Sequence, residues 1–218
     1  MRFFSRKNIV TLEKFGEKMV VRKEFSKKSN MFREIEVLRY LEASAMASHV
    51  PRLIFAEEEN KVIYLEYIRG SLLSELSPRE FIEKLSMAVE WLRKLHSLGL
   101  AKGDCNPRNF ILHENKMYGL DFEESRPLLL GNQEALRDLI DLMSTSILTM
   151  ASKGDDPGEA AMSIVRLIPS SYGSLFVSED EFLKLIEEFL QRRKKYRPES
   201  EALFNSVIGH LRRLRKSE

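Results

Sequence analysis

The sequence predicts an α+β fold in which a small antiparallel sheet precedes a mostly helical region. Short stretches of alternating apolar and polar residues, the pattern of β-hairpins, fall in the first third of the chain. The expected strands cover residues 9–15, 19–25, 52–56 and 61–67. Later stretches have helical periodicity. They cover residues 160–168, 180–196 and 198–214, with a loop at 153–159. We therefore expect two lobes, residues 1–68 with the sheet and one helix, and residues 69–218 with the other helices.

The composition is that of an ordinary globular protein. Hydrophobic residues occupy 43% of the 218 positions, which is enough to build a core. The 35 basic and 33 acidic residues nearly cancel, so net charge identifies no partner, and nucleic acid is not an expected one. Cys105 is the single cysteine, which excludes an intrachain disulfide and fits a reducing compartment. Because neither a signal-peptide core nor an apolar run of about 20 residues is present, we expect a cytoplasmic protein without a transmembrane segment.

One strand and the helix after it each place a charged residue among apolar ones. Lys23 shares its predicted strand face with apolar side chains, and the next helix puts Glu34 on its buried stripe. A buried charge is costly unless it is paired, so Lys23 and Glu34 are predicted to pair. The alternatives are a lysine at the sheet edge, a Glu34 that faces water, and Arg22 in place of Lys23 if the register shifts by one. Ser29 or Asn30 is expected to cap the helix.

Three polar side chains surround a further predicted hairpin. Asp104 and Asn109 lie five residues apart in a loop, and Asp121 follows after another twelve. The strands between them are expected at residues 110–112 and 117–120. Because a hairpin brings the two ends of its segment together, the three side chains should converge at one edge of a small sheet.

This convergence suits phosphoryl transfer, which depends on positioning and on charge neutralisation by magnesium. Magnesium prefers oxygen ligands, so Asn109 and Asp121 are predicted to hold it. Asp104 would then accept or orient the proton of an attacking hydroxyl. The alternative is a turn capped by aspartate and asparagine in an unrelated fold.

The same residues carry a resemblance to a known superfamily. The pattern G-D-x-x-x-x-N at residues 103–109, with Asp121-Phe122 after it, resembles the catalytic loop and metal-binding aspartate of protein-kinase-like proteins. The Gly-Asp pair is similar to that of aminoglycoside phosphotransferases. The string KGDCNPRNFI with a later RDLIDL is most similar to lipopolysaccharide core heptose kinases. The resemblance covers roughly residues 20–142 and implies a bilobal protein-kinase-like fold.

The resemblance also implies roles for the nucleotide-binding residues. Lys23 would orient the phosphates of ATP, and Glu34 would hold Lys23 in place. The run VIYLEYIRG would form the hinge strand and linker, with Gly70 at the crossover to the second lobe. Val21 would form a roof over adenine, and Glu66, Tyr67 and Ile68 would offer backbone groups to it.

The acceptor is expected to be a sugar or another small molecule. Only sixteen residues separate Asp121 from Asp138, which is short for the activation segment of a typical protein kinase. In the resembled families an aspartate at this point braces the catalytic loop, and Asp138 is preferred to Asp141 for this role. The leading function is therefore ATP- and Mg²⁺-dependent phosphorylation of a hydroxyl, possibly one of a lipopolysaccharide core sugar. The alternatives are an atypical serine/threonine protein kinase and a pseudokinase scaffold.

The pseudokinase scaffold alternative depends on the differences between this sequence and the protein-kinase-like motifs. No glycine-rich phosphate loop is visible, and the stretch before residue 9 is too short for a full first strand and loop. Either residues 5–8 serve as a minimal lid, or the loop is lost. Lys102 replaces the usual histidine and is interpreted either as lowering the pKa of Asp104 or as contacting an anionic substrate. Glu123 replaces the last glycine of D-F-G.

Three other features receive structural or surface interpretations. Trp91 is expected in the core, and His96 is expected to satisfy a buried hydrogen bond rather than to act in catalysis. Basic residues late in the chain are interpreted as a solvated face or as a contact for an anionic surface. They are Arg192, Arg193, Lys194, Lys195, Arg197, Arg212, Arg213, Arg215 and Lys216.

Overall fold

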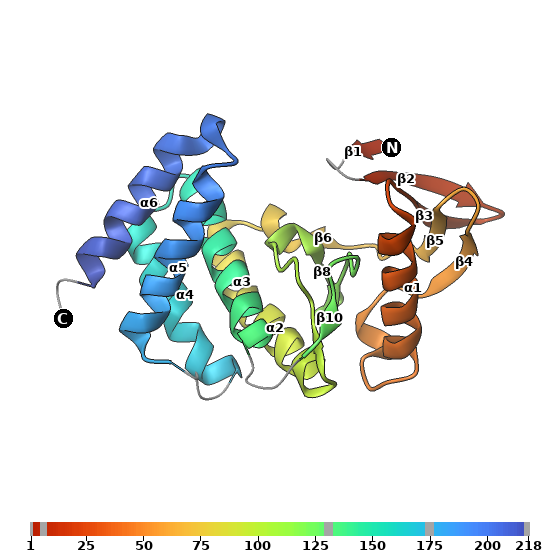
Figure 1. Ribbon diagram of the computed structural model, residues 1–218, viewed down its shortest axis with the longest axis horizontal. Coiled ribbons are helices and arrows are strands. Elements are labelled where there is room, and N and C mark those ends of the chain that lie inside the picture. Colours follow the sequence, from red (N-terminus) through yellow and green to blue (C-terminus); the bar gives the residue numbers. More distant parts are fainter. Residues whose placement is uncertain (1, 5–7, 129–132, 173–176, 216–218) are drawn as a thin grey trace.

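The structure, a computed structural model, describes residues 2–4, 8–128, 133–172 and 177–215. A twisted sheet and helix α1 form one end of the molecule, helices α3 to α6 form the other, and small strands lie between them (Figure 1). The predicted α+β, two-lobed fold is confirmed. The division at residue 68 stays a prediction.

The first lobe is built on an antiparallel sheet with the order β1-β2-β3-β5-β4. Its strands are β1 Arg2–Phe4, β2 Asn8–Phe15, β3 Lys18–Phe25, β4 Leu53–Glu57 and β5 Val62–Glu66. All four strands predicted there are confirmed, and the short β1 pairs with β2 ahead of them. Residues 5–7, most of the lid considered at residues 5–8, lie outside the described residues.

Helix α1 (Lys28–Glu42) packs one face on the inner side of this sheet. Its buried stripe includes Met31, Ile35, Leu38 and Leu41, and Glu34 lies within it. The expected cap at Ser29 or Asn30 is wrong, because the helix begins earlier and Lys27 stands at its N-cap without a side-chain hydrogen bond. The backbone carbonyl of Lys27 instead accepts the amides of Asn30 and Met31.

The chain enters the second lobe through β6 (Ser71–Leu72) and the long helix α2 (Pro78–Ser97). Glu80 reaches back to accept hydrogen bonds from the amide and hydroxyl of Ser77, and this capping box starts the helix. Trp91 is 2% exposed and packs edge-on against Phe110, so its placement in the core is confirmed.

The central hairpin pairs β8 (Phe110–His113) with β9 (Lys116–Gly119), and β6 adds a third strand. Glu114 and Asn115 both have positive φ, the signature of a type I′ turn, which fits the twist of the two strands. This hairpin is confirmed. A shorter pair joins β7 (Leu100–Ala101) to β10 (Arg126–Pro127).

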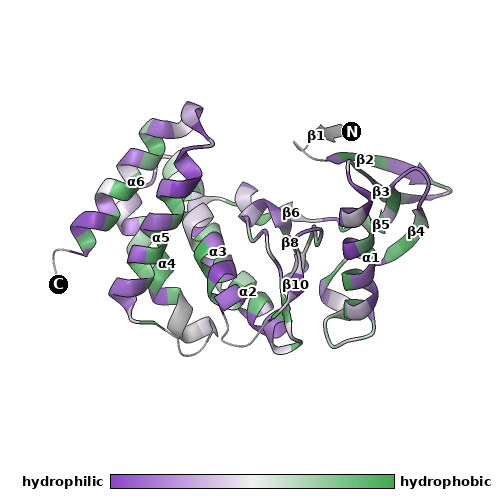
Figure 2. Cartoon of the chain, viewed as in Figure 1, coloured by the Kyte–Doolittle hydropathy of each residue, from purple (hydrophilic) through white to green (hydrophobic). Residues whose placement is uncertain are grey.

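Four helices complete the second lobe: α3 Gln133–Ser152, α4 Pro157–Tyr172, α5 Glu179–Lys194 and α6 Glu201–Leu214. Figure 2 shows apolar and polar faces along α5 and α6, and the apolar faces supply the core of this lobe. The predicted loop at 153–159 is too long, because Asp156 accepts the amides of Gly158 and Glu159 and Pro157 starts α4.

The late basic residues are largely engaged with acidic side chains on these helices. Arg212 and Arg215 of the described part pair with Glu187 and Asp180, and Lys194 pairs with Glu201. Lys216 lies outside the described residues. Across the described parts of the chain, none of the helices combines the length and the apolar character needed to cross a bilayer.

Candidate active site

A buried lysine on β3 joins the two lobes. The Nζ atom of Lys23 lies 2.5 Å from Glu34 Oε2 on α1 and 2.8 Å from Asp121 Oδ1 after β9. Lys23 is 5% exposed and Glu34 1%. Burial lowers the pKa of Lys23, but the charges of Glu34 and Asp121 outweigh it and hold this pKa above its usual value. The site therefore keeps an ammonium group between two carboxylates.

The sheet register explains why Lys23, and not its neighbour, takes this place. Lys23 pairs with Ile63 on β5, and its side chain points toward α1. Arg22 points to the other face, where it binds Glu24 at 3.0 Å. The register alternative that would substitute Arg22 is wrong.

Hydrogen bonds to the backbone bring the two ends of the predicted hairpin segment together. The side-chain Nδ2 of Asn109 donates to the backbone carbonyl of Asp104 at 3.2 Å. The backbone carbonyl of Asn109 accepts the backbone amide of Leu120, the residue before Asp121. A short 3-10 turn, Pro107–Asn109, shapes the loop, and Asn106 caps it by accepting the amide of Arg108 at 3.1 Å.

Asp121 has an uncommon backbone conformation and a shifted pKa. Its φ is 61°, a left-handed conformation that costs a non-glycine residue energy and tends to occur at functional sites. Burial raises the pKa of Asp121, but Lys23 and Lys102 together lower it below its ordinary value. Carboxylate and amide oxygens are ligands that Mg²⁺ accepts, and the assignment of Asp121 and Asn109 to magnesium stays a prediction.

Lys102 is a structural residue of the catalytic loop. It is 0% exposed, and its Nζ donates to the backbone carbonyls of Asp104, Leu120 and Asp121 at 2.8, 2.7 and 3.0 Å. The interpretation of Lys102 as a substrate contact is therefore wrong. Sequence reasoning missed its role because its partners are backbone oxygens, which no side-chain pattern reveals.

Two aspartates of α3 hold the backbone of the same loop. Asp138 accepts the amides of Lys102 and Gly103 at 2.6 and 3.0 Å, and Asp141 accepts that of Cys105 at 2.8 Å. Asp138 braces the loop as expected, and Asp141, the less favoured candidate, braces it as well.

His96 fills the buried structural place expected of it. Its Nε2 lies 3.0 Å from Asp138 Oδ2, and its Nδ1 lies 2.7 Å from the hydroxyl of Tyr172. The imidazole thus links α2 to α3 and α4, behind the catalytic loop.

Glu123 forms a buried hydrogen bond that the sequence pattern does not predict. Glu123, at the position of the missing glycine, accepts a hydrogen bond from Asn8 Nδ2 at 2.6 Å, and both side chains are buried. This contact ties the start of β2 to the segment that follows Asp121. The charge of Glu123 was visible in the sequence, but its partner lies 115 positions away.

Gly103 cannot carry a side chain in this loop. Its φ is +90°, and a Cβ atom would lie 2.3 Å from the carbonyl oxygen of Glu124. We expect Gly103→Ala to lower the free energy of unfolding by about 2–4 kcal/mol, measured by urea titration. Gly99 is the matched control, because its φ is also positive but nothing lies within 4 Å, so Gly99→Ala should cost only about 1 kcal/mol. Equal losses in the two variants would contradict the close contact.

The residues expected to bind adenine lie on β3 and at the C-terminal end of β5. Val21 pairs with Leu65 on the same face as Lys23, and Ile68 is buried just beyond β5. Glu66 donates its backbone amide to the carbonyl of Arg52 at 2.9 Å.

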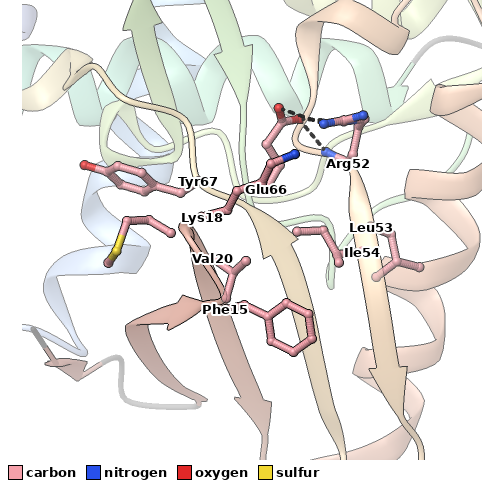
Figure 3. A pocket seen from close by; sticks show the side chains of 9 residues that line it. Phe15, Lys18, Val20, Arg52, Leu53, Ile54, Glu66 and Tyr67 are labelled. Carbon is pink, nitrogen blue, oxygen red and sulfur yellow. Dashed lines mark hydrogen bonds and ion pairs between the residues drawn. The ribbon is translucent and has the colours of Figure 1, made fainter.

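The side chains of Glu66 and Tyr67 line a cavity of about 610 Å³ together with Phe15, Val20, Arg52 and Ile54 (Figure 3). Val20 and Glu66 pair across the strands on the side of the sheet opposite Val21 and Lys23, so the side chain of Glu66 faces away from Lys23. Any contact of Glu66 with adenine would therefore use its backbone atoms.

Comparisons with known proteins agree with this geometry. The family model described as "Lipopolysaccharide kinase (Kdo/WaaP) family" matches residues 11–156, more than half of the chain. That range includes Lys23, Glu34, Asp104, Asn109 and Asp121.

Three curated relatives are also similar. The KEOPS complex subunit Bud32 of Pyrococcus abyssi is 35% identical over 100 residues, 44% of each chain. Two proteins named probable bifunctional tRNA threonylcarbamoyladenosine biosynthesis protein match as well. The one from Methanosarcina acetivorans is 22% identical over 71% of this chain and 26% of its own length. The one from Methanobrevibacter smithii is 28% identical over 67% and 25%.

The chain spans less than half the length of each of these relatives. The family match covers both the lysine strand and the loop that carries Asp104 and Asn109. The chain belongs to the lipopolysaccharide kinase (Kdo/WaaP) family, a group of the protein-kinase-like superfamily.

Proposed function

We propose that this kinase transfers the γ-phosphoryl group of ATP to a hydroxyl of a sugar or another small molecule. The observation that carries the proposal is the ion pair that joins Lys23 of the first lobe to Asp121, which follows the hairpin after the loop of Asp104 and Asn109. In phosphoryl transfer, catalysis consists almost entirely of positioning and electrostatic stabilisation, and these four side chains supply both.

Each residue has a distinct task in this proposal. Lys23 orients the phosphates, and Glu34 holds Lys23 in place. Asp104, whose side chain is 25% exposed, accepts or orients the proton of the acceptor hydroxyl. Asn109 and Asp121 hold Mg²⁺, which when bound neutralises the charge of the phosphates. The residues that contact adenine are Val21, Ile68 and the backbone of Glu66 and Tyr67.

Two features support a small-molecule acceptor. The segment between Asp121 and α3 is short, which leaves little room for a peptide platform. The family description names lipopolysaccharide kinases, so a lipopolysaccharide core sugar is the first acceptor to test. A cytoplasmic location suits ATP as donor, and the basic residues of α5 and α6 could meet an anionic acceptor surface.

A second candidate function comes from the relatives. Bud32 is named as a subunit of a complex, and the two other proteins are named for tRNA threonylcarbamoyladenosine biosynthesis. This chain could use ATP in tRNA modification together with protein partners. Stimulation of ATP turnover by tRNA, and not by sugar acceptors, would favour this candidate. Transfer of phosphate to protein would instead favour an atypical protein kinase.

Nucleotide binding is tested by thermal unfolding with ATP and Mg²⁺, on wild type and Asp121→Ala. A ligand at about 100 times its Kd adds about 2.7 kcal/mol, which for a chain of this size raises Tm by roughly 5–10 °C. We expect this shift in wild type, its loss when EDTA removes magnesium, and its absence in Asp121→Ala. No shift in wild type would sink the proposal and favour the scaffold alternative.

A further inference from the structure

An ion pair outside the family match reaches the catalytic loop. Arg193 lies in the last turn of α5, which packs beside α3 (Figure 1). Its Nη1 lies 2.7 Å from Oδ1 of Asp141, whose other oxygen accepts the amide of Cys105 at 2.8 Å. Cys105 directly follows Asp104 in the chain. One carboxylate therefore connects an arginine of α5 to the peptide bond beside the proposed catalytic base.

Asp141 needs a cationic partner at this position. Its side chain is 9% exposed, and Asp104 and Asp138 add negative charge nearby. Burial and these charges raise the pKa of Asp141, to about 6, even though Arg193 lowers it. A buried carboxylate that loses its partner is strongly destabilised or takes up a proton, and either change would weaken its hold on the Cys105 amide.

We propose that Arg193 is a positioning residue for Asp104, acting through the carboxylate of Asp141 and the backbone amide of Cys105. The inference rests on the proposed function of Asp104. The family match ends at residue 156, so it assigns no role to Arg193. An arginine suits the task because its guanidinium stays charged and is held in a fixed direction. It also lies over the ring of Phe189, 5.4 Å from the ring centroid.

Apolar contacts hold helix α5 in place independently of Arg193. Phe182, Leu183, Ile186 and Leu190 are all buried against the core of the second lobe. Arg193→Met keeps most of the side-chain stem and removes the charge. This variant should therefore disturb the loop more than it disturbs the helix packing.

The single cysteine provides a direct probe of the loop. Cys105 is 0% exposed, so a thiol reagent reacts with it only when the loop opens. At fixed pH, we expect Arg193→Met to be labelled about tenfold faster or more than wild type. Losing a nearby positive charge disfavours the thiolate and would slow labelling, so faster labelling reports greater access to Cys105 and not a more reactive thiol. Arg193→Lys should stay near the wild-type rate.

Arg192→Met is the matched control. Arg192 is the exposed neighbour of Arg193 and bonds the backbone carbonyl of Glu188, so its labelling rate should equal that of wild type. The Asp141→Asn variant lacks the buried carboxylate with which Arg193 pairs. Adding Arg193→Met to it should therefore change the labelling rate of Cys105 little further. Independent, additive effects of the two substitutions would overturn the proposal.

Enzyme kinetics complete the test, with phosphate release from MgATP to water as the reaction. We expect Arg193→Met to lower kcat about tenfold, to leave KM for ATP near its wild-type value, and to be rescued by lysine. Unchanged labelling and kcat would refute the proposal, and so would labelling that rises only in proportion to global unfolding in urea. If wild type fails to bind or turn over MgATP, the proposed function fails, whereas the labelling rates still decide whether Arg193 holds the loop.

Discussion

Replacing Asp104 with asparagine is expected to slow phosphoryl transfer to a hydroxyl about 10²- to 10⁴-fold, the usual contribution of general base catalysis. Asparagine keeps the shape of the side chain but cannot take up the proton. Binding of MgATP should be retained, because Lys23, Asn109 and Asp121 are untouched. Stability should change little, because the Asp104 side chain is partly exposed and its ion pair with Arg108 is loose at 4.0 Å.

The measurement pairs a transfer assay with the thermal shift described above. Glu114→Gln is the matched control, since it makes the same chemical change at a carboxylate that is 84% exposed in the turn between β8 and β9. A wild-type transfer rate in Asp104→Asn would remove Asp104 from the mechanism. Loss of biological function in an Asp104→Asn variant that folds and binds MgATP would rule out the scaffold alternative.

Replacing Lys23 with methionine should harm both stability and activity. The change leaves Glu34, which is 1% exposed, close to Asp121 without the cation that separates them. Removing one partner of a buried ion pair costs about 3–5 kcal/mol, so we expect a loss of that size in the free energy of unfolding. Transfer should fall about 10²- to 10³-fold, as when a single electrostatic stabiliser is removed from an active site.

Urea titration and the transfer assay measure the two effects separately. Arg22→Met is the control on the same strand, since Arg22 pairs with Glu24 on the opposite face and should cost less than about 1 kcal/mol. Adding Glu34→Gln to Lys23→Met should recover part of the stability but none of the activity. Full stability in Lys23→Met alone would show that the buried pair contributes nothing to folding.

Much of this site could be predicted because its signals are local. Alternation within one strand placed Lys23 on an apolar face, and helical periodicity placed Glu34 on a buried stripe. Each charge alone was ambiguous, but pairing removed the cost of burying both. The hairpin between Asn109 and Asp121 was similarly predictable, because its two strands and turn lie within a dozen residues.

The contacts that hold the site in place could not be predicted in this way. Lys102 binds backbone carbonyls, Asn8 meets Glu123 from 115 positions away, and Arg193 meets Asp141 from 52 positions away. The sequence by itself determined the sheet, the helix stripes and the pairing of Lys23 with Glu34, because local periodicity and the cost of burying charge act over short stretches. Only the tertiary structure decided which loop backbone each buried charge supports, because those partners become neighbours only when the helices pack.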